Sequence, residues 1–157
     1  MIDSIVPREA GLSSSSAFTV CSALVTMHAN GLIDKINKEE FSKLCVLAER
    51  MAGTACGGMD QTISIFAEKN KAKLIEFNPV LKAIDVDIPF SVSLVIANSL
   101  TPSPKLLTLG TRYNKRVVEC KFALAILAKG AGVIETWSSS PFKNFYDLQT
   151  KLGYSYD

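Results

Sequence analysis

A glycine followed by a run of serines is the first part of the sequence that could do chemistry. The run consists of Gly11, Leu12, Ser13, Ser14, Ser15 and Ser16, and a long apolar-periodic segment follows it. The start of a helix exposes unpaired backbone N–H groups and carries partial positive charge, so a glycine and short hydroxyl side chains there suit a phosphate group. The alternative is that the serines only cap the helix.

Two acidic residues could complete such a site. Phosphoryl transfer needs oxygen ligands for Mg²⁺ and a carboxylate that orients or deprotonates the attacking hydroxyl. Ser14 or Ser15 together with Glu49 could supply metal oxygens, and Asp60 could supply the carboxylate near the acceptor. Each acidic residue also has a structural interpretation. Glu49 would then be a solvated helix residue, and Asp60 would be the N-cap of a helix that begins at Gln61.

Other classes of chemistry find little support. The sequence contains neither a G-x-x-x-x-G-K-[ST] motif nor H-R-D or D-F-G, which disfavours P-loop and protein-kinase arrangements. His28 is the only histidine, so a histidine-dependent hydrolase would depend wholly on it. A formal charge of +2 without a basic stripe argues against nucleic acid as a partner. No stretch approaches the ~18 apolar residues of a membrane span.

The helices and strands that must position these residues are predicted from the spacing of apolar residues and from residues that end helices and strands. We expect helices over residues 14–30, 37–53, 60–67 and 111–129, with a last helix near residues 142–148. We expect strands over residues 2–6, 72–77 and 92–98, with a weaker extended segment at 84–88 and a loop over 100–110. The second helix should begin with a capping box at Asn37 and Glu40. Its predicted buried face consists of Phe41, Leu44, Cys45, Ala48 and Met51. This order of elements indicates an α+β fold.

Several short motifs together resemble one family of small-molecule kinases. Gly-Leu-Ser-Ser-Ser at 11–15 resembles the phosphate-binding motif of the GHMP kinases. Ala-Glu-Arg at 48–50, Gly-Gly-Met-Asp-Gln at 57–61 and Ile-Ala-Asn-Ser at 96–99 narrow the resemblance to the branch of galactokinase and N-acetylgalactosamine kinase. Tyr-Asn-x-Arg-Val-Val-Glu-Cys at 113–120 supports the same branch, so the resemblance covers nearly the whole chain.

The resemblance implies a role for each matching residue. The residues implied to contact the triphosphate of ATP are Gly11, Leu12, Ser13, Ser14, Ser15 and Ser16. Ser15 and Glu49 would hold Mg²⁺, and Asp60 would be the catalytic base facing the anomeric hydroxyl of the sugar. The residues implied to lie at the sugar are Gly57, Gly58, Asp60 and Tyr113. The alternative for Tyr113 is an aromatic residue that packs on the core at a helix start.

The resemblance also implies a fold and a domain organisation. Residues 1–100 would be part of a GHMP-kinase N-terminal domain, of the kind called ribosomal protein S5 domain 2-like, and residues 101–157 would begin the C-terminal domain. An upstream Gly-Arg-Val-Asn-Leu-Ile-Gly-Glu-His motif and a late glycine-rich motif do not occur, so we expect a truncated chain that is inactive alone and marginally stable.

The implied activity is transfer of phosphate from ATP to the 1-hydroxyl of galactose, with Mg²⁺. N-acetylgalactosamine kinase and a non-catalytic sugar and ATP sensor are the alternatives. We expect a monomeric cytoplasmic protein that acts on small molecules, without nucleic acid or a membrane as partner.

Overall fold

The computed structural model describes residues 3–89, 91–105, 107–136 and 140–155. The chain divides into two units, Met1–Leu107 and Thr108–Asp157, and each is described by itself. Whether these units correspond to parts of the two domains expected from the sequence stays a prediction.

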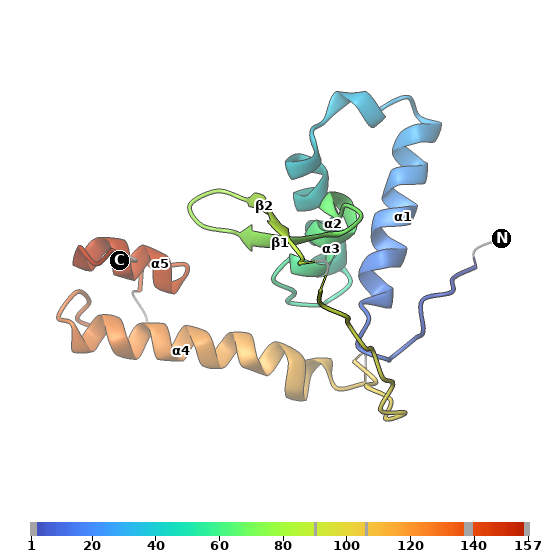
Figure 1. Ribbon diagram of the computed structural model, residues 1–157. Helices are drawn as coiled ribbons and strands as arrows, with labels where there is room; N and C mark the ends of the chain where they lie inside the picture. The colour runs from blue at the N-terminus through green and yellow to red at the C-terminus, as the bar shows by residue number, and fades with distance from the viewer. Residues whose placement is uncertain (1–2, 90, 106, 137–139, 156–157) are drawn as a thin grey trace. The chain divides into compact units, whose positions relative to one another are not determined.

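Three helices and a β-hairpin form the first unit (Figure 1). In chain order the elements are α1 (Ser14–Ala29), a 3₁₀ turn η1 (Ile33–Lys35), α2 (Lys38–Met51), α3 (Met59–Phe66), β1 (Lys71–Glu76) and β2 (Lys82–Asp87). Helix α1 packs against both α2 and α3, α2 packs against α3, and α3 contacts β1. The mixture of helices and a small antiparallel sheet confirms the predicted α+β class.

The core of this unit lies between α1 and α2. Val20 and Met27 of α1 are buried against Phe41 and Cys45 of α2, and Ile65 of α3 packs at the edge. Cys45 is fully buried, and this burial raises the pKa of its thiol, because a thiolate is poorly solvated there. All four cysteines are free. The core therefore rests on apolar contacts between α1 and α2.

The start of α2 follows the predicted capping box. The Asn37 side chain accepts a hydrogen bond from the Glu40 backbone N–H at 2.8 Å, and the Glu40 carboxylate accepts one from the Asn37 N–H at 3.2 Å. The predicted buried face is only partly right, because Leu44, Ala48 and Met51 are exposed. The face that packs on the other helices consists of Phe41, Ser42, Cys45 and Glu49.

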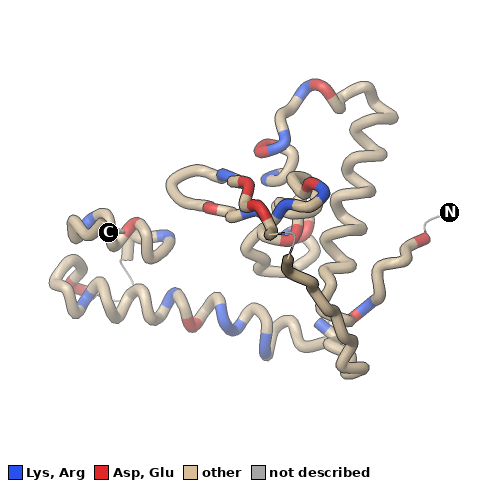
Figure 2. Tube along the Cα trace, in the orientation of Figure 1, with Lys and Arg blue, Asp and Glu red and all other residues tan. Residues whose placement is uncertain are grey.

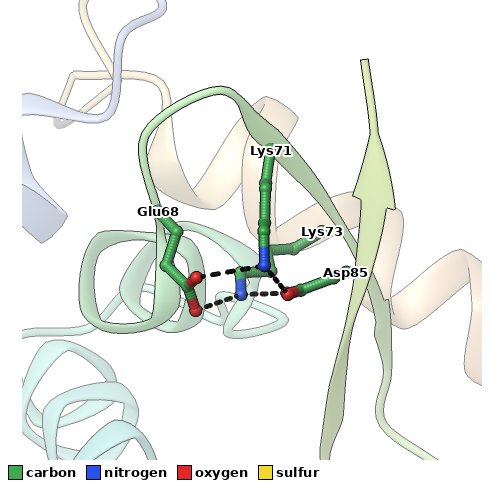
Figure 3. A network of polar contacts seen from close by, with 4 residues as sticks. All are labelled: Glu68, Lys71, Lys73 and Asp85. Carbon is green, nitrogen blue, oxygen red and sulfur yellow. Dashed lines mark hydrogen bonds and ion pairs between the residues drawn. The ribbon is translucent and has the colours of Figure 1, made fainter. Parts of the chain in front are cut away.

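The hairpin is an antiparallel pair with a regular register from Lys71 opposite Asp87 to Glu76 opposite Lys82. Ion pairs cover one face of it (Figure 3), since Lys71 and Lys73 each contact both Glu68 and Asp85. Charges of both signs thus lie side by side along this hairpin in Figure 2. The ammonium groups hold the pKa of the Asp85 carboxyl below its ordinary value, with the hydrogen bond from Lys71 as the largest cause.

Two of the predicted strands are wrong in the described residues. Residues 3–6 and 92–98 form no strand, and residue 2 lies outside the described part of the chain. The segment 92–98 has no regular secondary structure and is exposed, with Leu94 at 75%, Val95 at 91% and Ile96 at 83%. A strand needs a hydrogen-bonded neighbour, and the described sheet consists of β1 and β2 alone. The weaker segment at 84–88 instead forms β2 with β1.

The second unit is helical. It contains a π-helical turn η2 (Leu109–Tyr113), the long helix α4 (Asn114–Gly130) and α5 (Phe145–Leu152). Leu124 and Ala128 of α4 pack against Leu148 of α5. Cys120, also on α4, is exposed. None of the helices in the described ranges is long and apolar enough to cross a membrane.

Candidate active site

The serine run forms the turn that leads into α1. Gly11 has φ +74° and Ser13 has φ +55°, so the chain passes through left-handed backbone just before the helix. Ser13 is the N-cap residue, but its side chain makes no capping hydrogen bond. The interpretation of the serines as helix caps alone is therefore not supported, and at least two of the hydroxyls have another use.

These two hydroxyls donate hydrogen bonds to a carboxylate on the neighbouring helix. The Ser15 hydroxyl donates to Glu49 Oε1 at 2.8 Å, and the Ser16 hydroxyl donates to Glu49 Oε2 at 2.9 Å. Glu49 lies near the end of α2 and is only 5% exposed, so it is not the solvated helix residue of the alternative interpretation. It makes no ion pair with any residue that the structure describes.

A glutamine from α3 completes the surroundings of this carboxylate. Gln61 is 1% exposed, and its Nε2 donates to Glu49 Oε2. The same nitrogen lies 3.6 Å from the Cys56 sulfur. Gln61 is the last residue of the Gly-Gly-Met-Asp-Gln motif, and no residue spacing in the sequence marks it as part of the site. The carboxylate therefore joins all three helices of the first unit.

The loop between α2 and α3 brings Gln61 into place. Arg50 holds this loop by hydrogen bonds from its guanidinium to the Cys56 carbonyl oxygen. Gly58 is the N-cap of α3 with φ +105°, and a Cβ at that position would lie 2.9 Å from a methyl group of Val46. Both the backbone conformation and the close packing thus require glycine there.

Asp60 lies in the first turn of α3 and is half-buried. The N-cap of this helix is Gly58, so the alternative in which Asp60 caps a helix starting at Gln61 is wrong. Asp60 is the sequence neighbour of the residue that contacts Glu49, on a helix that packs against α1. Its role as a base stays a prediction, as do the roles of the exposed Gly57 and of Gly58 toward the sugar.

Tyr113 ends the π-helical turn η2 of the second unit and is half-buried. The site described above is built from the first unit alone. The predicted role of Tyr113 toward the sugar therefore stays a prediction.

The spacing of two oxygen atoms at Glu49 is compatible with neighbouring ligands of a magnesium ion. Two neighbouring ligands of an octahedral Mg²⁺ at about 2.1 Å lie about 3 Å apart. The Ser15 Oγ and Glu49 Oε1 are 2.8 Å apart, which matches this spacing once the hydroxyl hydrogen turns away. The described residues contain no group of three or more His, Cys, Asp or Glu side chains that could hold a metal. A cation here would need further oxygens, and Mg²⁺ commonly takes them from substrate phosphates.

Comparison with known proteins tests the predicted family. Residues 1–68 match the family described as GHMP kinases N terminal domain. This part of the chain is similar to the N-terminal domain of the GHMP kinases. The family predicted from the sequence motifs is thereby confirmed, together with the corresponding N-terminal domain.

Relatives named as galactokinases match most of the chain. A galactokinase of Dictyostelium discoideum is 52% identical over 128 residues, which cover 82% of this chain and 25% of the relative. A galactokinase of Schizosaccharomyces pombe is 43% identical over 133 residues, with the same two shares. A galactokinase of the bacterium Chloroflexus aggregans is 34% identical over 138 residues, or 86% of this chain and 33% of the relative. The chain thus spans a quarter to a third of these relatives.

Proposed function

We propose that this chain supplies the phosphate-binding and base-bearing part of an ATP-dependent sugar 1-kinase, a galactokinase. The observation that carries the proposal is the contact of the Ser15 and Ser16 hydroxyls with the buried carboxylate of Glu49. A buried carboxylate without a cationic partner is costly, and a metal ion bound with ATP would neutralise it. The names of the relatives support galactose as the acceptor.

Each proposed role uses a property of the residue concerned. The turn from Gly11 to Ser16 would bind the phosphates of ATP through backbone N–H groups at the start of α1. Ser15 and Glu49 would hold Mg²⁺, which when bound offsets charge on the phosphates. Asp60 would accept the proton of the anomeric hydroxyl through its carboxylate. Gly57 and Gly58 would let the backbone approach the sugar closely.

The alternatives differ in what they require of these residues. N-acetylgalactosamine kinase would use the same phosphate and metal residues and differ in the space around the C2 substituent of the sugar. A non-catalytic sensor tolerates loss of residues from the serine turn, whereas this chain keeps all four serines. The retained serines favour the enzyme. We also propose that the protein is monomeric and cytoplasmic, as expected for an enzyme of small-molecule metabolism.

A chimera tests the enzyme against the sensor. The 128 aligned residues of the Dictyostelium galactokinase would be replaced by those of this chain, and galactose 1-phosphate formation would be measured. We expect activity within about tenfold of the parent, because binding and positioning residues are shared. Asp60→Asn in the chimera should lower kcat about 10²–10⁴-fold, the usual contribution of a general base. A folded chimera that binds ATP but shows no turnover would support the sensor instead.

The 157-residue chain by itself should not turn over galactose. It covers 25% of the Dictyostelium relative, so most residues of a complete kinase lie elsewhere in such a protein. A coupled assay for ADP with ATP and galactose checks this expectation. Turnover within tenfold of the full-length Dictyostelium galactokinase would contradict it.

A further inference from the structure

The side-chain amide of Gln61 is not fully used by the contacts described above. Its Nε2 has two hydrogens, of which one points to Glu49 Oε2 and the other is available to the Cys56 sulfur. Only the nitrogen can donate to a carboxylate, so this contact fixes which end of the amide faces Glu49. The carbonyl oxygen of Gln61 therefore points elsewhere, and it is buried without a hydrogen-bond partner among the described residues.

An unpartnered buried carbonyl oxygen is uncommon, because it loses its hydrogen bond to water without a replacement. A water molecule bound to a cation at Glu49 would be a strong donor for it. The Nε2 of the same amide already donates to Oε2 of Glu49, so Oε1 of Glu49 is left to face Ser15. The Gln61 side chain thus has a donor, Nε2, that binds the expected metal ligand Glu49, and an acceptor, Oε1, that has no partner among the described residues.

We propose that Gln61 is a positioning residue for the metal site: its Nε2 fixes the orientation of the Glu49 carboxylate, and its Oε1 accepts a hydrogen bond from a water molecule of the hydrated cation. This inference rests on the proposed function, since it takes Glu49 as the metal ligand. Partners of this kind commonly change metal affinity about 10–100-fold when they are removed. Gln61 would act through Glu49 and would touch neither ATP nor the sugar.

The test measures how much the metal improves nucleotide binding, rather than turnover. The 157-residue chain is titrated with ATP by calorimetry, once in Mg²⁺ and once in EDTA. The readout is the dissociation constant in EDTA divided by the dissociation constant in Mg²⁺, called the ratio below. Gln61→Met keeps the length of the side chain and removes both the amide donor and acceptor. We expect it to lower the ratio about tenfold while the dissociation constant in EDTA stays within twofold.

Two control variants separate this inference from the function on which it rests. Glu49→Gln removes the expected metal ligand and should abolish the Mg²⁺ effect. Gln149→Met makes the same change on α5 of the second unit, where the Gln149 amide bonds the exposed Ser155 carbonyl, and should leave the ratio unchanged.

Three results would overturn the inference. If Gln61→Met keeps the parent ratio while Glu49→Gln loses it, the metal site stands and Gln61 does not position it. If Gln61→Met weakens ATP equally with and without Mg²⁺, its role is purely structural. If the unsubstituted chain and Glu49→Gln bind ATP alike in both conditions, the proposed metal site fails and the inference fails with it.

A measurement on the unsubstituted chain covers the case in which Gln61→Met does not fold. With ATP present, Mn²⁺ should broaden the side-chain amide resonances of Gln61 in nitrogen-15 spectra, because the amide lies beside the metal. The same Gln61 signal recorded with ATP and diamagnetic Mg²⁺ is the control and should stay sharp. A sharp Gln61 signal at saturating Mn²⁺ and ATP would contradict the proposal.

Discussion

The guanidinium of Arg50 donates two hydrogen bonds to the carbonyl oxygen of Cys56, from Nε at 3.0 Å and from Nη2 at 2.8 Å. Arg50 directly follows Glu49 at the end of α2, and Cys56 lies in the loop that leads to α3. This contact closes the loop between the two helices that carry Glu49 and Gln61. It therefore links the order of the loop to the geometry of the site.

Arg50→Lys should loosen that loop. A lysine can donate to the Cys56 carbonyl but cannot reproduce the two-pronged contact of the guanidinium. We expect a loss of about 1–2 kcal/mol in the free energy of unfolding, a drop in melting temperature of about 2–6 °C. Thermal denaturation followed by circular dichroism measures it. Arg112→Lys, an exposed change in the second unit, is the control, and an equal effect in both variants would refute the role of Arg50.

Ser16→Ala should lower the stability of the fold, whereas Ser15→Ala should remove the effect of Mg²⁺ on ATP binding. Ser16 is 1% exposed, so losing its hydroxyl leaves a cavity and removes a buried hydrogen bond to Glu49, at a cost of about 1–2 kcal/mol in stability. Ser15 is exposed, and its loss should change stability by under about 0.5 kcal/mol but remove the Mg²⁺ effect on ATP binding. Melting curves and calorimetry on both variants decide the matter. Equal melting temperatures for the two would count against this division of roles.

Gly58→Ala should be destabilising, and Gly57→Ala should be tolerated. An alanine at 58 would have to adopt φ +105° and would place its Cβ 2.9 Å from Val46, whereas a Cβ at 57 meets nothing within 4 Å. We expect Gly58→Ala to cost about 1–3 kcal/mol. Urea denaturation of the two variants measures the difference. Adding Val46→Ala should relieve the steric part and leave the backbone strain.

The hairpin ion pairs should make stability depend on acid pH. The pKa of the Asp85 carboxyl is held down chiefly by its hydrogen bond from Lys71, so the native state binds fewer protons than the unfolded chain near an ordinary aspartate pKa of about 3.9. The stabilisation is complete above that value and is lost as the pH falls through the lower native pKa. The pKa of Glu68 is lowered in the same direction, chiefly by Lys73.

Melting temperatures between pH 2.5 and 7 test this dependence. Asp85→Asn should flatten the acid limb of the curve, because the neutral amide cannot titrate. Asp87→Asn, on the same strand and without an ion pair to a described residue, is the matched control. An unchanged acid limb in Asp85→Asn would rule out a contribution from this carboxylate.

Local signals predicted much of the fold. The capping box at Asn37 and Glu40 is contained within a few residues, and the apolar-periodic segment directly follows the serine run, so both helices begin where the sequence indicates. The strand expected over 92–98 failed for the opposite reason. Its apolar pattern is real, but pairing depends on a distant segment, and no local signal supplies one.

The candidate site was predictable only in part. Serines and acidic residues pointed to phosphate chemistry, and the structure brings Ser15, Ser16 and Glu49 together. The burial of Glu49 was missed, although Phe41, Cys45 and Glu49 recur every fourth residue and share one helix face. A charged residue on that face was a signal worth following. Gln61 was missed because its neighbour Asp60 offered the more familiar chemistry.

Because Glu49 takes its partners from two other helices, the cradle is absent whenever those helices separate. ATP bound as proposed would therefore bind only folded chains, and by mass action each tenfold rise in free ATP above its dissociation constant would add about 1.4 kcal/mol to their stability. Bound ATP would thus slow proteolysis of the folded chain even where no sugar is bound.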